Sequence, residues 1–144
     1  MQKIIISQYF AAPRSHIFQE LADHVRFGEI VGANISRIQE GQDGYPNGVG
    51  SVRRIAMPLG MSFQETIVEY DHDSKIVYSV SQGSPIKSHR GVLVFSDVDG
   101  GTLLDYSIEF EPRWPVPGLG SVLHQVIKGP IDKGLKQFAQ SFTS

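Results

Sequence analysis

The feature that most constrains the fold is a run of short strand-like segments, separated by tight turns, in the second half of the chain. In residues 102–111 apolar side chains alternate with Asp105, Ser107 and Glu109, which is the period of a half-buried antiparallel strand. Turns rich in Asp, Ser and Gly separate this segment and its predecessors. Successive strands joined by tight turns predict an antiparallel sheet built from hairpins.

The rest of the chain predicts a single α+β domain that covers residues 1–144. Pro13 suits the first turn of a helix, and a second short helical piece covers residues 23–30. The turn-rich stretch EGQDGYPNGVG separates two further candidate strands. The predicted strands lie at residues 3–10, 34–39, 50–57, 62–70, 75–82, 89–98 and 102–111.

Residues 119–142 predict a long amphipathic helix with an unusual centre. Gly129, Pro130 and Gly134 lie inside it, although proline in a helix interior costs roughly 3 kcal/mol. At about 100° per residue, the apolar stripe after Pro130 is rotated by about 120° from the stripe before it. We expect either a wide turn at residues 127–131 that bends the helix and brings both stripes onto one sheet, or two separate helices.

Composition excludes several classes of function. The chain is 40% hydrophobic and 19% charged, as ordinary globular proteins are. A net charge of -2 gives no electrostatic reason to expect binding to nucleic acid or to an anionic membrane. Without cysteine there is no disulfide, thiolate nucleophile or sulfur-based zinc site. The N-terminal apolar run is too short for a signal peptide or a spanning helix, so we expect a cytoplasmic protein without membrane insertion.

The order of elements, with the phrases GVGSVRRI, ETIVEYDHDSKIVYSV and DVDGGTLLDYSIEFEP before a long final helix, resembles the polyketide cyclase/dehydrase-like branch of the START/Bet v 1 superfamily (SRPBCC). The resemblance covers nearly the whole chain. It implies a helix-grip fold, in which a seven-stranded antiparallel sheet wraps around the C-terminal helix and an internal apolar cavity. It also implies binding of a small hydrophobic molecule (lipid, isoprenoid or polyketide-like) without metal or cofactor. A cyclase/dehydratase-type enzyme and a protein-interaction module are the alternatives.

One finer similarity concerns the plant hormone receptors of that superfamily, which have a gate loop and a latch containing His-Arg. In this sequence MPLGM occupies the gate position, at residues 57–61, and His89-Arg90 follow the loop at residues 83–87. MPLGM does not match the receptors' Ser-Gly-Leu-Pro-Ala pattern, which argues against a hormone-type switch. The resemblance nevertheless favours a position for His89 at the pocket mouth.

Candidate ligand-binding residues lie on the later strands and around the start of the long helix. Tyr78 and Tyr106 fall on apolar strand faces, so their hydroxyls lie either inside the cavity or against backbone or solvent. Trp114 either lines the cavity mouth or packs the junction between strand and helix. His89 with Tyr106 is the arrangement expected of an acid–base enzyme. The predicted ligand-binding residues are Tyr78, Val80, His89, Tyr106, Ile108, Phe110, Trp114, Val122 and Val126.

No catalytic or metal-binding residue is predicted from a motif. The five histidines are scattered, and no Ser-His-Asp spacing, HExxH, P-loop or GxGxxG is present. YDHDS contains metal-ligating residue types, but its place at a hairpin tip indicates a solvated turn. Arg53 and Arg54 face Glu65 and Glu69 as candidate cross-strand partners, and an inward-facing pair would form a buried ionic anchor for a ligand.

Overall fold

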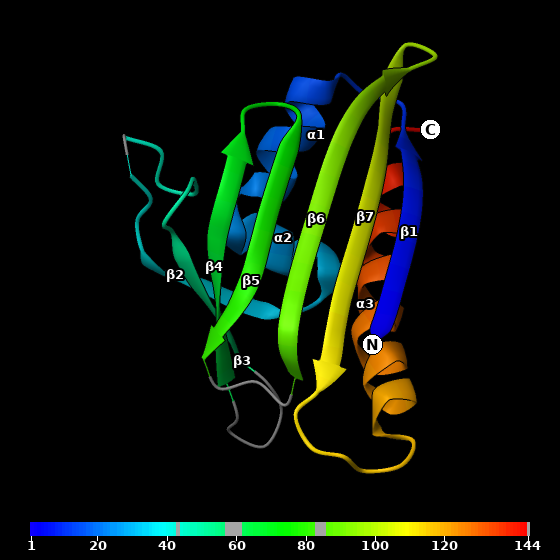
Figure 1. The fold of residues 1–144 in the computed structure, drawn as a ribbon. Coiled ribbons are helices and arrows are strands. Elements are labelled where there is room, and N and C mark those ends of the chain that lie inside the picture. The colour runs from blue at the N-terminus through cyan, green and yellow to red at the C-terminus, as the bar shows by residue number, and fades with distance from the viewer. Residues whose placement is uncertain (43, 57–61, 83–85, 144) are drawn as a thin grey trace.

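The computed structural model describes residues 1–42, 44–56, 62–82 and 86–143, which form a seven-stranded antiparallel sheet and three helices (Figure 1). This confirms the predicted α+β architecture. The strands are β1 (Gln2–Phe10), β2 (Asn34–Gln39), β3 (Val52–Ala56), β4 (Ser62–Asp71), β5 (Lys75–Gln82), β6 (Ile86–Val98) and β7 (Gly101–Pro112). The helices are α1 (Arg14–Ala22), α2 (His24–Val31) and α3 (Leu119–Gln140).

The sheet has the order β1-β7-β6-β5-β4-β3-β2, so that β2 to β7 follow one another as hairpins and β1 returns to pair with β7. The helices lie on one face of the sheet (Figure 1). The pairing register shifts within β4 and again in β6 between Lys87 and Arg90. Because such irregularities bend and twist a strand, they help the sheet to curve around the helices.

The core forms where the inward faces of β1 and β7 meet α3. Ile4 and Ile6 of β1 lie opposite Ile108 and Tyr106 of β7, and all four are buried. Burial of each aliphatic side chain of this kind contributes about 1.5–3 kcal/mol to folding. At the other end of β1, Phe10 packs against Phe138 of α3, with a distance of 5.4 Å between the ring centroids. These contacts fix the second half of α3 to the sheet.

α3 is one continuous α-helix with Pro130 inside it, and the described part of the chain contains no π turn. Both the wide turn and the two-helix alternative are therefore wrong. The apolar stripe changes direction because the two halves have different partners. Leu123 and Ile127 face a pocket, whereas Gly134 and Phe138 pack against α2 and β1. In the part of the chain that the structure describes, no helix is both long and apolar enough to cross a membrane.

Candidate ligand-binding site

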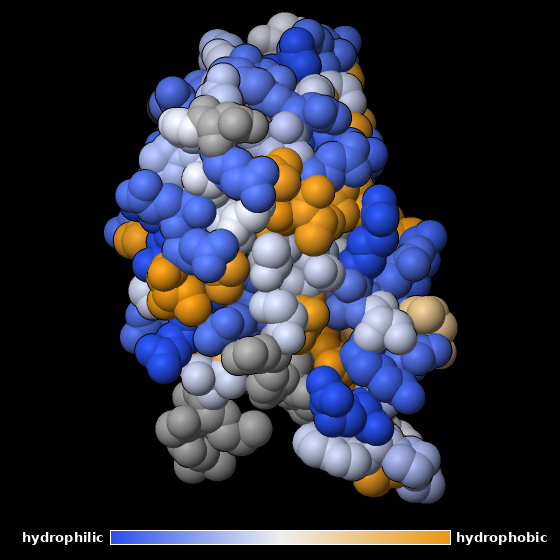
Figure 2. All heavy atoms as spheres, turned by 60° about the vertical axis from the view of Figure 1, so that its left-hand side comes forward, coloured by the Kyte–Doolittle hydropathy of each residue, from blue (hydrophilic) through white to orange (hydrophobic). Residues whose placement is uncertain are grey.

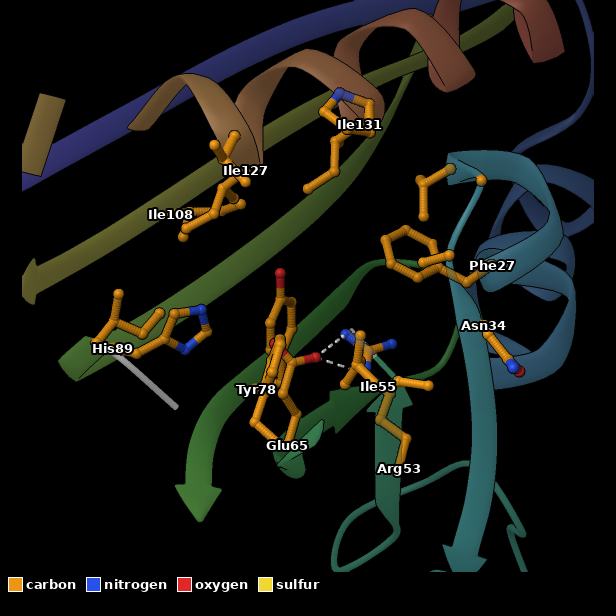
Figure 3. Close-up of a pocket in the computed structure, with 18 of the residues that line it drawn as sticks. Phe27, Asn34, Arg53, Ile55, Glu65, Tyr78, His89, Ile108, Ile127 and Ile131 are labelled. Atoms are coloured by element: carbon orange, nitrogen blue, oxygen red, sulfur yellow. Dashed lines mark hydrogen bonds and ion pairs between the residues drawn. The ribbon is translucent and has the colours of Figure 1, made fainter. Parts of the chain in front are cut away.

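A pocket of about 650 Å³ lies between the sheet, α2 and the first half of α3 (Figure 3). Ile127 and Ile131 project into it from α3, and Phe27 enters from α2. Most of the wall is apolar, and the volume falls within the range of about 300–1,000 Å³ that is usual for small-molecule sites. The polar side chains gather on the sheet side, where Arg53, Glu65 and His89 come from three strands.

A buried ion pair forms the centre of this polar wall. Arg53 of β3 lies directly opposite Glu65 of β4. Its Nε atom donates a hydrogen bond to Oε1 of Glu65 at 2.8 Å, and its Nη2 atom forms an ion pair with the same oxygen, also at 2.8 Å. The guanidinium carbon also lies 4.5 Å from the ring centroid of Tyr78 and 5.0 Å from that of Phe27, within cation–π distance. The inward-facing pair that the charge pattern offered as a hypothesis is therefore present.

The other two charged residues of that hypothesis do not belong to the pocket. Arg54 is exposed and lies opposite Gln64. Glu69 forms an ion pair with Lys75 on the next strand, with 3.2 Å between its Oε1 and the lysine Nζ. Burial acts to lower the pKa of Arg53, but the Glu65 carboxylate, together with Tyr78 and Tyr106, outweighs burial and raises that pKa above its usual value. Arg53 therefore stays charged inside the pocket wall.

Two tyrosine hydroxyls meet beside the ion pair. Tyr78 of β5 and Tyr106 of β7 are hydrogen-bonded to each other, although β6 runs between their strands. Gly91 of β6 makes this contact possible, because a Cβ atom there would lie 2.3 Å from Cζ of the Tyr78 ring. Burial raises the pKa of both hydroxyls, so both keep their protons at neutral pH. The pair thus supplies uncharged hydrogen-bonding groups to the pocket.

His89 borders the same wall from the irregular part of β6. Its ring centroid lies 5.2 Å from that of Tyr78. Its Nδ1 atom is buried and has no hydrogen-bond partner among the residues that the structure describes. Burial lowers the pKa of His89, Glu65 opposes this lowering, and Arg53 adds to it. The imidazole is therefore neutral at pH 7, and the described residues leave one of its nitrogen atoms open to a further partner.

Five of the nine predicted ligand-binding residues lie on the pocket wall: Tyr78, His89, Tyr106, Ile108 and Val126. Val80 packs against the core, and Phe110 is fully buried within it. Trp114, in the segment before α3, is 53% exposed, and Val122 is 59% exposed because it lies about 100° around the helix from Leu123. These four residues do not line the pocket, and ligand contact by the other five stays a prediction.

Sequence reasoning missed the apolar residues that α2 and α3 contribute, such as Phe27, Ile127 and Ile131. The spacing of four residues between Leu123, Ile127 and Ile131 was the available signal. The proposed gate, residues 57–61, and positions 83–85 of the neighbouring loop lie outside the described residues. Among the residues that the structure describes, no group of three or more His, Asp or Glu side chains could hold a metal ion.

A second buried histidine, His24, makes the stability of the fold depend on pH. Its Nε2 atom lies 3.0 Å from the Ser51 hydroxyl, and burial, followed by Arg53 and Arg37, lowers its pKa to about 3. Above pH 6.5 this histidine is neutral in both the folded and unfolded states. Between pH 6.5 and about 3 only the unfolded state binds the proton, so stability falls as the pH falls.

We expect the free energy of unfolding to decrease by about 2 kcal/mol between about pH 7 and pH 5 because of His24 alone. Urea denaturation at a series of pH values measures this decrease. His24→Asn should flatten the pH dependence over that interval. A variant whose stability falls as steeply as that of the wild type would contradict the assignment.

Comparison with known proteins agrees with the geometry. Residues 1–143 match the family model described as polyketide cyclase / dehydrase and lipid transport. Similar solved structures include XoxI from Bacillus cereus, at 19% identity and a TM-score of 0.73, with 99% of this chain and 96% of that chain covered. TTHA0849 from Thermus thermophilus is 16% identical, with a TM-score of 0.73 and coverage of 99% and 100%.

Ara h 8.0201 is a further similar structure, at 18% identity and a TM-score of 0.67, with 97% of this chain and 98% of that chain covered. Identities this low establish a shared fold. No curated protein matches the sequence. The match to the family model, however, extends over nearly the entire chain, and the similar solved structures share its fold. The chain therefore belongs to the polyketide cyclase/dehydrase and lipid transport family.

Proposed function

We propose that this protein binds a small, mostly apolar molecule in the pocket between the sheet and α3, and that residues 1–144 act as one ligand-binding domain. The observation that carries the proposal is a pocket of about 650 Å³ whose walls are apolar except for a polar group on the sheet side. Burial of apolar ligand surface would supply most of the affinity. The family description, which includes lipid transport, supports a ligand of this kind.

Filling the pocket tests the proposal. Ile127 is half-buried and lines the pocket, so we expect Ile127→Trp to occupy ligand space. The neutral fluorescent probe N-phenyl-1-naphthylamine should bind the wild type with a Kd of about 1 μM, and the variant at least about 30-fold more weakly. Fluorescence titration measures both affinities, and circular dichroism checks the fold.

Val122→Trp is the matched control. Val122 lies on the same helix but is 59% exposed and outside the pocket lining, so the same substitution there should leave probe affinity unchanged. Equal effects of the two tryptophans would show that the probe binds elsewhere. A wild type that does not bind the probe at all would overturn the proposed function.

Acid–base catalysis in the same pocket is the second candidate, and one observation favours it. The neutral His89 lies beside the Tyr78 ring, and its buried Nδ1 has no partner within the described part of the chain. A neutral imidazole can accept a proton from a bound substrate, and a tyrosine hydroxyl can stabilise the charge that develops. The Tyr106 hydroxyl, which sequence reasoning paired with His89, is bonded to Tyr78 instead. If the pocket is catalytic, His89→Phe should abolish turnover of a polyketide-like substrate, and the variant should still bind that substrate.

An interaction module receives less support. Such a function would favour a filled interior together with a continuous exposed apolar face. The interior contains a pocket, and in Figure 2 the exposed apolar atoms form separate patches surrounded by hydrophilic residues. Ligand binding explains both observations more directly.

A further inference from the structure

The charges of the pocket wall indicate which kind of polar group a ligand carries. Arg53 and Glu65 are the charged residues among the described lining of the pocket, and they neutralise each other. Both bonds from Arg53 end on one carboxylate oxygen, and rings of Phe27 and Tyr78 lie near its guanidinium group. The side chains of the pair are 5% and 10% exposed. Arg53 is therefore a compensated charge, and it does not act as a free cation.

The remaining polar groups are uncharged donors and acceptors. Two hydroxyls that bond to each other use one of their two protons, so the Tyr78–Tyr106 pair retains one proton to donate. His89 adds a buried nitrogen atom to which no described residue is hydrogen-bonded. A hydroxyl or carbonyl group of a ligand can satisfy these groups. An ionised carboxylate would instead leave a net negative charge beside Glu65 in a poorly solvated pocket, which is costly.

We infer that the pocket selects uncharged amphiphiles, with a hydroxyl or carbonyl group against the Arg53–Glu65 and Tyr78–Tyr106 wall, and rejects carboxylates of the same chain length. This inference rests on the proposed function, because it specifies the ligand class of the same pocket. In Figure 3 the side chains of Arg53, Glu65 and Tyr78 lie across from Ile127 and Ile131. An apolar chain that extends from the polar group would therefore contact α3.

Competition between 1-decanol and decanoate tests the inference. At about pH 7.5, 1-decanol should displace N-phenyl-1-naphthylamine from the wild type at a concentration at least about tenfold lower than decanoate. Any apolar pocket disfavours an ionised group to some extent. The diagnostic quantity is therefore the ratio of the displacing concentrations of decanoate and 1-decanol, and how this ratio changes when the charges of the pocket wall change. Glu65→Gln leaves the charge of Arg53 uncompensated. In that variant decanoate should gain at least about tenfold relative to 1-decanol.

A second variant adds a cation without disturbing the buried pair. Val126 is 53% exposed and lines the pocket, so Val126→Lys places an unpaired ammonium group at the rim and should also favour decanoate. Val122→Lys is the control with the same net charge, because Val122 lies outside the lining, and it should leave the ratio unchanged. The second variant decides the inference if Glu65→Gln does not fold.

The outcomes separate the two proposals. Decanoate that binds the wild type as tightly as 1-decanol would overturn the inference and leave the proposed function standing. An unchanged ratio in both folded pocket variants would overturn it as well. Absence of probe, alcohol and acid binding in the wild type would overturn the proposed function and the inference together.

Discussion

Glu65→Leu alone should lower the free energy of unfolding by about 3–5 kcal/mol, because it leaves the Arg53 guanidinium buried without its counter-charge. Arg53 is 4% exposed, and its Nε hydrogen bond and its Nη2 ion pair both end on Oε1 of Glu65. Neighbouring aromatic rings provide attraction, but they cannot replace the solvation that a full charge loses on burial. Denaturation by urea, monitored by circular dichroism, measures the loss.

Replacing both partners should recover most of this loss. In Arg53→Met/Glu65→Leu no buried charge is left, and the stability should return to within about 1–2 kcal/mol of the wild type. The half-buried pair between Lys75 and Glu69 is the matched control, since it also joins neighbouring strands but keeps contact with solvent. Glu69→Leu should cost no more than about 1 kcal/mol. A double variant as unstable as Glu65→Leu would contradict the account, because the lost packing would then explain the effect.

The sheet could be predicted from the sequence because its signals are local. Alternation of side chains in residues 102–111 marks a strand, and tight turns between segments indicate that consecutive strands pair. In the structure β2 to β7 do follow one another in the sheet. Strand ends were less certain. β6 begins at Ile86 rather than at His89, since it continues past an irregularity in its pairing with β7 at which Ser88 has a φ of 52°. Nothing in the alternation of side chains marks such an irregularity in advance.

The pocket depends on relations that periodicity does not determine. Val122 and Val126 form one apolar row at the start of α3, and Leu123 and Ile127 form another beside it. Hydrophobicity gives no reason to prefer either row. The orientation of the helix decides. It turns Val122 outward to 59% exposure and Val126 to 53%, so that Val126 reaches the pocket only at its rim. That orientation is set where the second half of α3 packs against β1 and α2. These contacts join segments that are far apart in the sequence, so local periodicity does not reveal them.

Gly134 shows how closely that second half approaches α2. A Cβ atom at this position would lie 2.2 Å from the carbonyl oxygen of Ile30 and 2.8 Å from Cα of Val31. Both are backbone atoms, so no side chain can rotate away to make room. Gly129, five residues earlier in the same helix, has open space around the corresponding position. The two glycines therefore lie in the same helix for different reasons, and only Gly134 is required by packing.

Gly134→Ala should accordingly destabilise the protein by about 3 kcal/mol, although alanine is the better helix former. The added methyl group forces α2 and α3 apart and disturbs Leu135 and Phe138, which are buried beside it. Gly129→Ala makes the same chemical change where no other element is in contact. Because Pro130 disfavours the helical conformation for a preceding residue with a Cβ atom, this variant should gain little and change the free energy of unfolding by no more than about 1 kcal/mol. Urea denaturation of the two variants, compared with the wild type, measures both effects. A Gly134→Ala variant that is as stable as the wild type or more stable would contradict this account, because helix propensity would then outweigh the contact between the helices.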